Sequence, residues 1–196
     1  MWQKRWQKKM KFTPLLKLPE KGNPYYNTKS AGGYSDCIVG SPTVKGLNVL
    51  CNCVGFEVGR FNEISNKGKK VYFGSMNAKS FYPWAVKHGL PTGKTPKLGA
   101  CICFSGGKDG LGHVASVEEL DDKGNCTLVS SGYKSYEFKV QKNCNASNNY
   151  GMSKSNKFES FIYNPDLENS TNDDIKELLE DAKKLIDKAE EKLSEV

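Results

Sequence analysis

Seven cysteines and two histidines in this 196-residue sequence could together carry out nucleophilic chemistry. A cysteine attacks as the thiolate, and a histidine within hydrogen-bond reach can accept the thiol proton. Cys53 opens a segment whose apolar side chains recur at helical spacing, namely Val54, Val58, Phe61 and Ile64. The N-terminus of a helix lowers the pKa of a thiol through aligned peptide dipoles and free N–H groups. Cys53 is therefore the predicted nucleophile.

The two histidines differ in their surroundings. His113 follows a glycine-rich turn at residues 108–112 and opens the apolar run 114–117, which would hold an imidazole at the end of a strand, facing a cleft. His88 lies in residues 86–89, a predicted helix C-terminus, where a cationic side chain merely complements the helix dipole. We therefore predict His113 as the general base.

The surrounding pattern indicates a helix and a sheet that would position these two side chains. A helix is predicted from near Cys53, although its two glycines lower helix propensity while permitting close packing against a neighbouring strand. A second short helix is predicted over residues 76–88, and residues 11–50, with their prolines and glycines, are expected to form an irregular arm packed over the core. Antiparallel strands are predicted over residues 99–104, 113–118, 126–130 and 158–163, with a turn at 121–124.

Four short motifs occur in a characteristic order. They are Asn52-Cys53-Val54-Gly55-Phe56, residues 95–100, Gly112-His113-Val114-Ala115-Ser116-Val117-Glu118 and Ser130-Ser131-Gly132-Tyr133. This set resembles the signature of the CHAP family (cysteine, histidine-dependent amidohydrolase/peptidase) of the papain-like NlpC group, especially endolysins from phages and prophages of Firmicutes. The resemblance implies an α+β fold over roughly residues 11–165, in which a cysteine-bearing helix packs on an antiparallel sheet that carries the histidine.

The resemblance also implies a thiol-dependent peptidoglycan hydrolase. Such an enzyme cleaves an amide bond, either between N-acetylmuramic acid and L-alanine or inside the stem or cross-bridge peptide. By that analogy Cys53 attacks the carbonyl, His113 takes its proton and later protonates the leaving amine, and water resolves the acyl-enzyme.

The third catalytic position departs from the family pattern. Many members place Glu or Asn on the strand after the histidine to orient the imidazole, whereas this chain has Ser130. A hydroxyl can accept from the ring N–H, more weakly than a carboxylate does. Either Ser130 suffices, or a backbone carbonyl or nearby side chain substitutes, or the alignment is displaced by one residue.

Further residues are predicted to bind substrate or stabilise the oxyanion. The backbone N–H of Cys53 is expected to donate to the oxyanion, with Asn52 as a helper and Gly112 beside the histidine. Tyr133 is expected either to line the substrate groove or to belong to the core.

No metal or cofactor is predicted. Family members that bind calcium use an Asp-rich loop before the cysteine, and residues 43–50 contain no acid. Two C-x-C pairs, Cys51 with Cys53 and Cys101 with Cys103, raise the question of zinc, but their spacing is shorter than that of zinc sites. Residues two apart on a strand share one face, so Cys101 and Cys103 are expected to be buried together. The odd number of cysteines favours a reduced compartment.

The net charge of +7 and pI of about 8.9 favour a polyanionic partner. Peptidoglycan with anionic wall polymers is the predicted partner, and no nucleic acid or membrane partner is predicted. A nucleic-acid-binding protein stays the weaker alternative, because the sequence has no zinc-finger, helix-turn-helix or RNP-like signature. A non-catalytic wall-binding protein is the other alternative, which Ser130 makes plausible.

Three segments make up the predicted organisation. Residues 1–10 form a basic N-terminal extension without a signal peptide, residues 11–165 the catalytic domain, and residues 166–196 an acidic linker and an amphipathic helix. We expect a protein of the host cytoplasm that acts on the cell wall after release. The a/d spacing of the final helix is consistent with oligomerisation, with docking to another module, or with folding back onto the domain.

Overall fold

The structure is a computed structural model that describes part of the chain. The described residues are 12–20, 23, 25–26, 52–65, 73, 76–132, 138–167, 179–187 and 190. Within these residues, every helix is too short or too polar to traverse a lipid bilayer.

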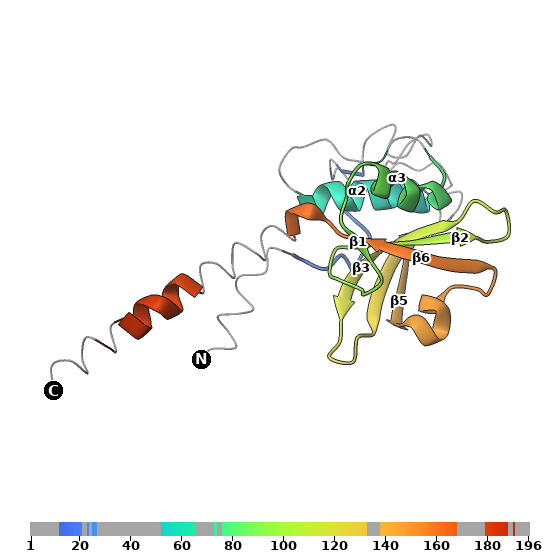
Figure 1. Ribbon diagram of the computed structural model, residues 1–196. Coiled ribbons are helices and arrows are strands. Elements are labelled where there is room, and N and C mark those ends of the chain that lie inside the picture. The colour runs from blue at the N-terminus through green and yellow to red at the C-terminus, as the bar shows by residue number, and fades with distance from the viewer. Residues whose placement is uncertain are drawn as a thin grey trace.

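A six-stranded antiparallel sheet forms the centre of the domain (Figure 1). Its strands are β1 (Thr92–Gly93), β2 (Cys101–Gly106), β3 (His113–Leu120), β4 (Cys126–Ser131), β5 (Phe138–Cys144) and β6 (Asn156–Ile162). Their spatial order is β1-β6-β2-β3-β4-β5. Strands β2 to β5 therefore follow one another as a meander, and β6 returns to the opposite edge of β2.

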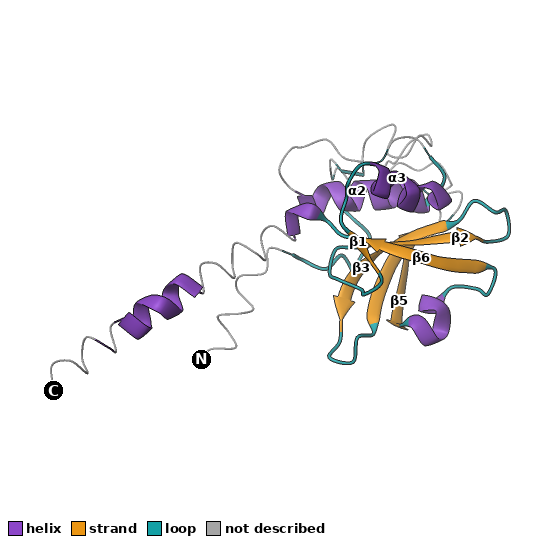
Figure 2. Cartoon of the chain, viewed as in Figure 1, coloured by secondary structure: helices purple, strands orange, loops and turns teal. Residues whose placement is uncertain are grey.

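Helices cover one face of this sheet (Figure 2). They are α2 (Cys53–Ser65), the 3₁₀ turn η2 (Ala78–Ser80) and α3 (Phe81–Lys87). Helix α2 buries Val54, Val58 and Phe61 against side chains of the sheet such as Cys103 and Val114. This packing lays α2 across β3 and β4, so the helix and the strand that carry the predicted catalytic residues belong to one core.

The opposite face of the sheet has a core of its own. It is aromatic, with the rings of Tyr150, Phe158 and Phe161 lying 4.9–5.4 Å apart between centroids. Tyr150 belongs to the 3₁₀ segment η3 (Ala146–Gly151), which follows β5. The sheet is therefore buried on both faces over most of its area.

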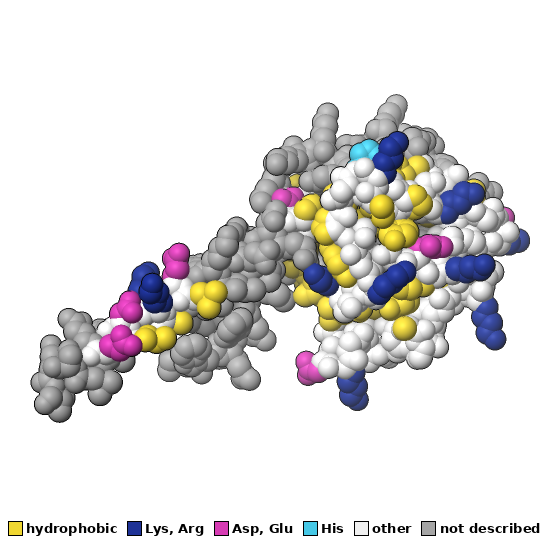
Figure 3. Space-filling model, in the orientation of Figure 1, with side chains coloured by type: hydrophobic (Ala, Val, Ile, Leu, Met, Phe, Trp, Pro, Cys, Tyr) yellow, Lys and Arg dark blue, Asp and Glu magenta, His cyan; other side chains and the backbone are white. Residues whose placement is uncertain are grey.

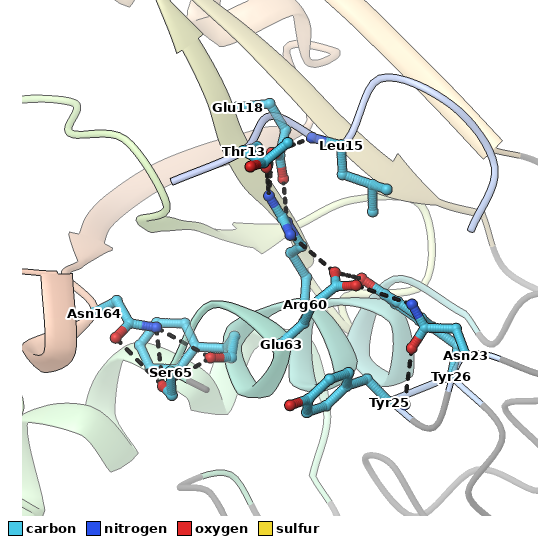
Figure 4. Close-up of polar contacts among 11 residues, drawn as sticks. Thr13, Leu15, Asn23, Tyr25, Tyr26, Arg60, Glu63, Ser65, Glu118 and Asn164 are labelled. Atoms are coloured by element: carbon cyan, nitrogen blue, oxygen red, sulfur yellow. Dashed lines mark hydrogen bonds and ion pairs between the residues drawn. The ribbon is translucent and has the colours of Figure 1, made fainter. Parts of the chain in front are cut away.

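A buried ion pair ties the N-terminal arm to α2 and β3 (Figure 4). Arg60 of α2 meets Glu118 of β3 through two hydrogen bonds, Nε to Oε1 at 2.8 Å and Nη2 to Oε2 at 2.7 Å. Arg60 Nη2 also donates to the carbonyl of Thr13 at 2.7 Å, and the N–H of Leu15 donates to Glu118 at 2.8 Å. The Arg60 guanidinium lies over the ring of Phe12, 5.2 Å from its centroid. The described part of the arm thus packs over the core, as predicted.

The α+β fold class and the main elements agree with the sequence predictions. The helix from Cys53, the short helix within residues 76–88 and the four predicted strands are present, with strand ends displaced by at most two residues. Strands β1 and β5 were not predicted. The close approach of Gly59 in α2 is to Tyr25 and Tyr26 of the arm, instead of to a strand.

The tail is described over residues 179–187 and 190. Residues 179–187 form a helix whose side chains are all exposed, including Leu179, Leu185 and Ile186 at 57–65%. Residues 179–187 are therefore not packed against the described part of the domain. Its role in oligomerisation or docking stays a prediction, and residues 1–10 lie outside the described residues.

Candidate active site

A cavity of about 430 Å³ lies where the N-terminus of α2 meets the start of β3. It brings together five of the predicted site residues, which are Asn52, Cys53, Gly112, His113 and Ser130. These residues come from α2, the loop before β3, β3 itself and β4. Tyr133, the sixth, lies outside the described residues.

Cys53 is the first residue of α2, and Asn52 caps that helix. The Asn52 side-chain Oδ1 accepts a hydrogen bond from the N–H of Gly55 at 3.0 Å, and its carbonyl accepts from the N–H of Phe56 at 2.9 Å. Asn is among the preferred N-cap residues because its side chain satisfies an otherwise unpaired N–H. The visible role of Asn52 is therefore to fix the start of the helix, and only its Nδ2 would be left to assist an oxyanion.

The thiol of Cys53 is partly buried, and burial decides its acidity. Desolvation raises the pKa of Cys53 above the ordinary 9.0, and it outweighs the lowering by the backbone N–H groups of Val114, Val54 and Cys53 itself. The negative charge of Glu57, one turn along the helix, raises it further. The lowered thiol pKa expected from the helix N-terminus is thus wrong for the free protein, although the N–H groups responsible for it are in place.

His113 is the first residue of β3 and pairs with Phe104 of β2. Gly112 turns the chain into the strand with a φ of +81°, and its N–H donates to the Gly106 carbonyl at 2.9 Å. A Cβ at Gly112 would lie 2.3 Å from the Phe104 carbonyl oxygen and 2.6 Å from the backbone N of Lys79. Only glycine fits there, so Gly112 determines where the imidazole sits.

The imidazole of His113 is held neutral. Burial, followed by the positive charge of Lys139, lowers the pKa of His113 to about 4. A neutral imidazole can accept a proton, so the group is in the correct form for a general base. Together with the raised pKa of Cys53, this means that thiol and imidazole are both uncharged in the free protein at neutral pH.

Ser130 lies in the cavity wall but does not orient the imidazole in this structure. It is buried in β4, pairs with Lys139 of β5, and its Oγ has no hydrogen-bond partner among the residues that the structure describes. A hydrogen bond between Ser130 and His113 is therefore not formed. The role of Ser130 as third catalytic residue stays a prediction.

His88, the rejected histidine, lies outside this cavity. It is exposed at the end of α3, its ring stacks on Trp84 at 3.9 Å between centroids, and its Nδ1 lies 2.8 Å from the Trp84 carbonyl. Because His88 does not line the cavity, it is in no position to take the Cys53 proton there.

Sequence reasoning missed the polar residues that β5 and β6 contribute to the cavity wall. Lys139 and Gln141 come from β5, and Asn156 begins β6. The signal was present, because apolar and polar residues alternate from Phe138 to Val140 and a strand in this register places Lys139 and Gln141 on one face.

Cys101 and Cys103 share one face of β2, as expected for residues two apart on a strand. Both are buried in the core beneath α2, with their Sγ atoms 3.8 Å apart. Among the described residues, no group of three or more His, Cys, Asp or Glu side chains is placed to hold a metal ion. Cys51 and the loop 43–50 lie outside the described residues.

A thiol at a helix N-terminus and an imidazole at a strand end face one cavity of an α+β domain, which is the arrangement that nucleophilic catalysis by a cysteine needs. Residues 43–132 match the model of the CHAP domain family. Both Cys53 and His113 fall within the matched residues. The resemblance read from the four motifs is confirmed.

Among solved structures, the fold is similar to that of an N-acetylmuramoyl-L-alanine amidase from Staphylococcus aureus. The TM-score is 0.43 at 22% sequence identity, and the match covers 57% of this chain and 30% of that chain. This chain thus matches less than a third of the length of that amidase chain. No curated protein matches this sequence.

Proposed function

We propose that this protein hydrolyses an amide bond of bacterial peptidoglycan through a covalent Cys53 acyl-enzyme. The observation that carries the proposal is the placement of Cys53 and His113 in the wall of one cavity, each at the end of an element fixed by its own packing. The bond is either the N-acetylmuramoyl-L-alanine amide or a peptide bond of the stem or cross-bridge.

The proposed reaction runs in two halves. The Cys53 Sγ attacks the amide carbonyl while His113 takes the thiol proton, and the tetrahedral oxyanion is stabilised by backbone N–H groups at the start of α2. The C–N bond then breaks, and His113 returns the proton to the leaving amine. A water molecule, deprotonated by His113, attacks the thioester and releases the carboxylic acid with the free thiol.

The surface charge supports a wall substrate. Figure 3 shows Lys and Arg side chains spread over the visible face of the domain, where acidic side chains are fewer. A positive surface attracts anionic wall polymers, and salt screens such attraction. Binding to purified walls should therefore weaken as salt rises. Release into the wall compartment from the host cytoplasm, as in phage lysis, is the setting we propose.

A non-catalytic wall-binding protein is the second candidate. The observation that favours it is the Ser130 Oγ, which has no hydrogen-bond partner among the described residues, at the position where the resemblance implies an orienting side chain. A cavity that keeps its thiol and imidazole neutral would then be a remnant of a catalytic site.

The test is turbidity loss of purified Gram-positive cell walls, with mass spectrometry of the released fragments. Wild type should clear the walls, Cys53→Ala and His113→Gln should not, and His88→Gln should act like wild type because His88 lies outside the cavity. The fragments identify the bond. If wild type and Cys53→Ala both bind walls from several species and neither releases fragments, the hydrolase is refuted and the binding protein is supported.

A further inference from the structure

Outside the catalytic cavity, the structure brings two thiols together on neighbouring strands. Cys126, the first residue of β4, is the direct cross-strand partner of Cys144, the last residue of β5. Both residues are buried, at 1% exposure each, and both belong to the apolar cluster that contains Tyr150 and Phe161. The two thiols therefore lie on the same face of the sheet, where the side chains of direct partners are neighbours.

The backbone geometry of this pair suits a disulfide bond. Direct partners in an antiparallel pair have Cα atoms roughly 4.5–5.5 Å apart. A disulfide spans about 4.4–6.8 Å between its Cα atoms, so the pair falls within that range. The Cys126 Sγ already reaches across to β5, where it lies 3.1 Å from the carbonyl oxygen of Cys144. Bond formation thus needs rotation of the two side chains and leaves the strands in place.

The residues next to the two cysteines hold them in this register. Asn125 precedes Cys126, and its Oδ1 accepts a hydrogen bond from Nδ2 of Asn145, which follows Cys144, at 2.8 Å. On the other side of the pair, the register of β4 with β5 shifts just after Cys126, and Asn143 has a φ of +56°. This irregularity separates the Cys126–Cys144 pair from the rest of the ladder. A covalent bond at this point would hold the end of β5 that lies beyond the irregularity.

The pair lies between two cavities of the domain. Cys126 borders a cavity of about 380 Å³, and the residues described around it include none that line the catalytic cavity. On the other side, β5 and the segment after it contribute Gln141 and Gly151 to the catalytic cavity. A Cβ at Gly151 would lie 3.2 Å from the Cys144 Sγ. A small oxidant thus has a route toward Cys126, and a bond at Cys144 would fix one wall of the catalytic cavity.

We propose that Cys126 and Cys144 form a redox-dependent disulfide that holds β5 on β4, with a low-molecular-weight disulfide such as oxidised glutathione as the oxidant. The Cys126 thiolate attacks one sulfur of the oxidant, which gives a mixed disulfide and releases one small thiol. The Cys144 thiolate then attacks the Cys126 Sγ and displaces the second small thiol. One protein S–S bond replaces two S–H bonds, and the oxidant takes up two electrons and two protons.

The compartment decides when this bond forms. Cytosolic thiols are kept reduced, whereas disulfides persist outside a reducing cytosol. Both cysteines are free thiols in this structure, which is the form expected before release. That the protein reaches a non-reducing compartment rests on the proposed function, whereas the chemistry of the pair does not.

Peptide mapping tests the bond directly, with the protein kept in dithiothreitol or exposed to oxidised glutathione at about pH 8.5. Burial, followed by the charge of Cys144, raises the pKa of Cys126 to about 12, so the reaction should take hours. After alkylation of free thiols in denaturant, trypsin places the two cysteines in separate peptides, residues 124–134 and 143–154. Oxidised protein should yield these peptides linked, and reduced protein should yield both alkylated.

Thermal unfolding tests whether the bond holds the strands in the folded protein. Closing the loop of residues 126–144 should raise the midpoint of unfolding of oxidised wild type by about 10 °C over reduced wild type. Cys144→Ala should unfold at one temperature with or without the oxidant. Cys103→Ala, which removes a buried thiol of β2 and keeps the pair, should retain the full shift. The comparison of wild type in two redox states stands even if a variant fails to fold.

Three results would overturn the proposal. The peptides 124–134 and 143–154 stay unlinked after prolonged oxidation, or either cysteine bonds to a different one, or the linked protein unfolds at the same temperature as the reduced protein. The first result would make Cys126 and Cys144 two buried hydrophobic residues. None of these readouts uses wall lysis, so a protein that forms the bond and fails to clear walls refutes the proposed function alone.

Discussion

Glu57 should make the stability of this protein fall as pH rises, and the size of the effect can be worked out from its surroundings. Its side chain is fully buried, one helical turn after Cys53, and among the described residues its carboxyl meets no N–H or O–H donor and only the weak thiol donor of Cys101. Burial is the main cause that raises the pKa of Glu57 to about 8, followed by the charge of Glu118, with Cys101 and Arg60 acting in the opposite direction.

The sign follows from proton binding. Between pH 4.5, the ordinary pKa, and pH 8, the folded protein holds a proton on Glu57 that the unfolded chain releases, so the free energy of unfolding falls with rising pH. The fall amounts to about 3 kcal/mol by pH 7 and about 5 kcal/mol above pH 8. The contribution of the neutral carboxyl is fully present below pH 4.5 and is lost through pH 8.

His113 acts in the opposite direction over a lower range. Its folded pKa of about 4 lies below the ordinary 6.5, so stability rises with pH between these values, by about 3 kcal/mol. The two groups nearly cancel between pH 4.5 and 6.5. From pH 6.5 to 8 only Glu57 acts, and these two groups together should lower wild-type stability by about 2 kcal/mol.

Urea unfolding at pH 6, 7, 8 and 9 measures how the free energy of unfolding depends on pH. Wild type is compared with Glu57→Gln and, as a control, with Glu180→Gln on the exposed tail helix. The difference in unfolding free energy between wild type and Glu57→Gln should shift by about 3 kcal/mol in favour of the variant from pH 6 to pH 9. Glu180→Gln should follow wild type at every pH. A difference between wild type and Glu57→Gln that stays constant with pH would show that Glu57 is ionised throughout and that its burial is wrongly described.

Three further predictions follow from the geometry. Gly112→Ala should lower the free energy of unfolding by at least about 2 kcal/mol and abolish wall lysis, because a Cβ at this position meets backbone atoms. Gly124 has a similar positive φ but open space around it, so Gly124→Ala should cost about 1 kcal/mol and keep activity. Urea unfolding and wall-turbidity assays compare the two variants. Arg60→Met leaves a buried carboxylate unpaired and should cost about 3–5 kcal/mol in unfolding free energy, against roughly nothing for Lys184→Met in an exposed pair. Alkylation of Cys53 by iodoacetamide should accelerate up to and beyond pH 9 without a plateau at neutral pH, and a plateau between pH 5 and 8 would reveal a preformed thiolate.

The elements that carry the catalytic residues were predictable because each has a strong local pattern. Helix α2 shows apolar side chains at helical spacing despite its glycines, and Gly59 turns out to be required there, since a Cβ would lie 2.9 Å from the Tyr25 carbonyl. Strand β5 was missed because most of its side chains are partly buried or exposed, so polar residues dominate its sequence. The wall of the cavity that contains Lys139 was missed with it.

The electrostatic state of the site was not predictable from sequence. The start of a helix favours a thiolate, but the degree of burial of Cys53 depends on how α2 packs on β3, and burial proves the larger effect. The same holds for Ser130. Its place on β4 could be read from the motif, but whether its Oγ reaches His113 depends on the twist and on the bulge between Val117 and Glu119, where the pairing of β3 with β4 shifts.

The neutral thiol of Cys53 and the neutral imidazole of His113 determine how much of the reaction barrier the free protein must overcome to move a proton. With the thiol pKa above 9 and the imidazole pKa at about 4, moving the proton from Cys53 to His113 in the free protein costs at least about 7 kcal/mol. A turnover of about 10 per second corresponds to a barrier of about 16 kcal/mol, so nearly half of it would be used before any bond forms. Catalysis therefore requires that the proton move from Cys53 to His113 as Sγ attacks, so that the negative charge passes directly to an oxyanion held by backbone N–H groups.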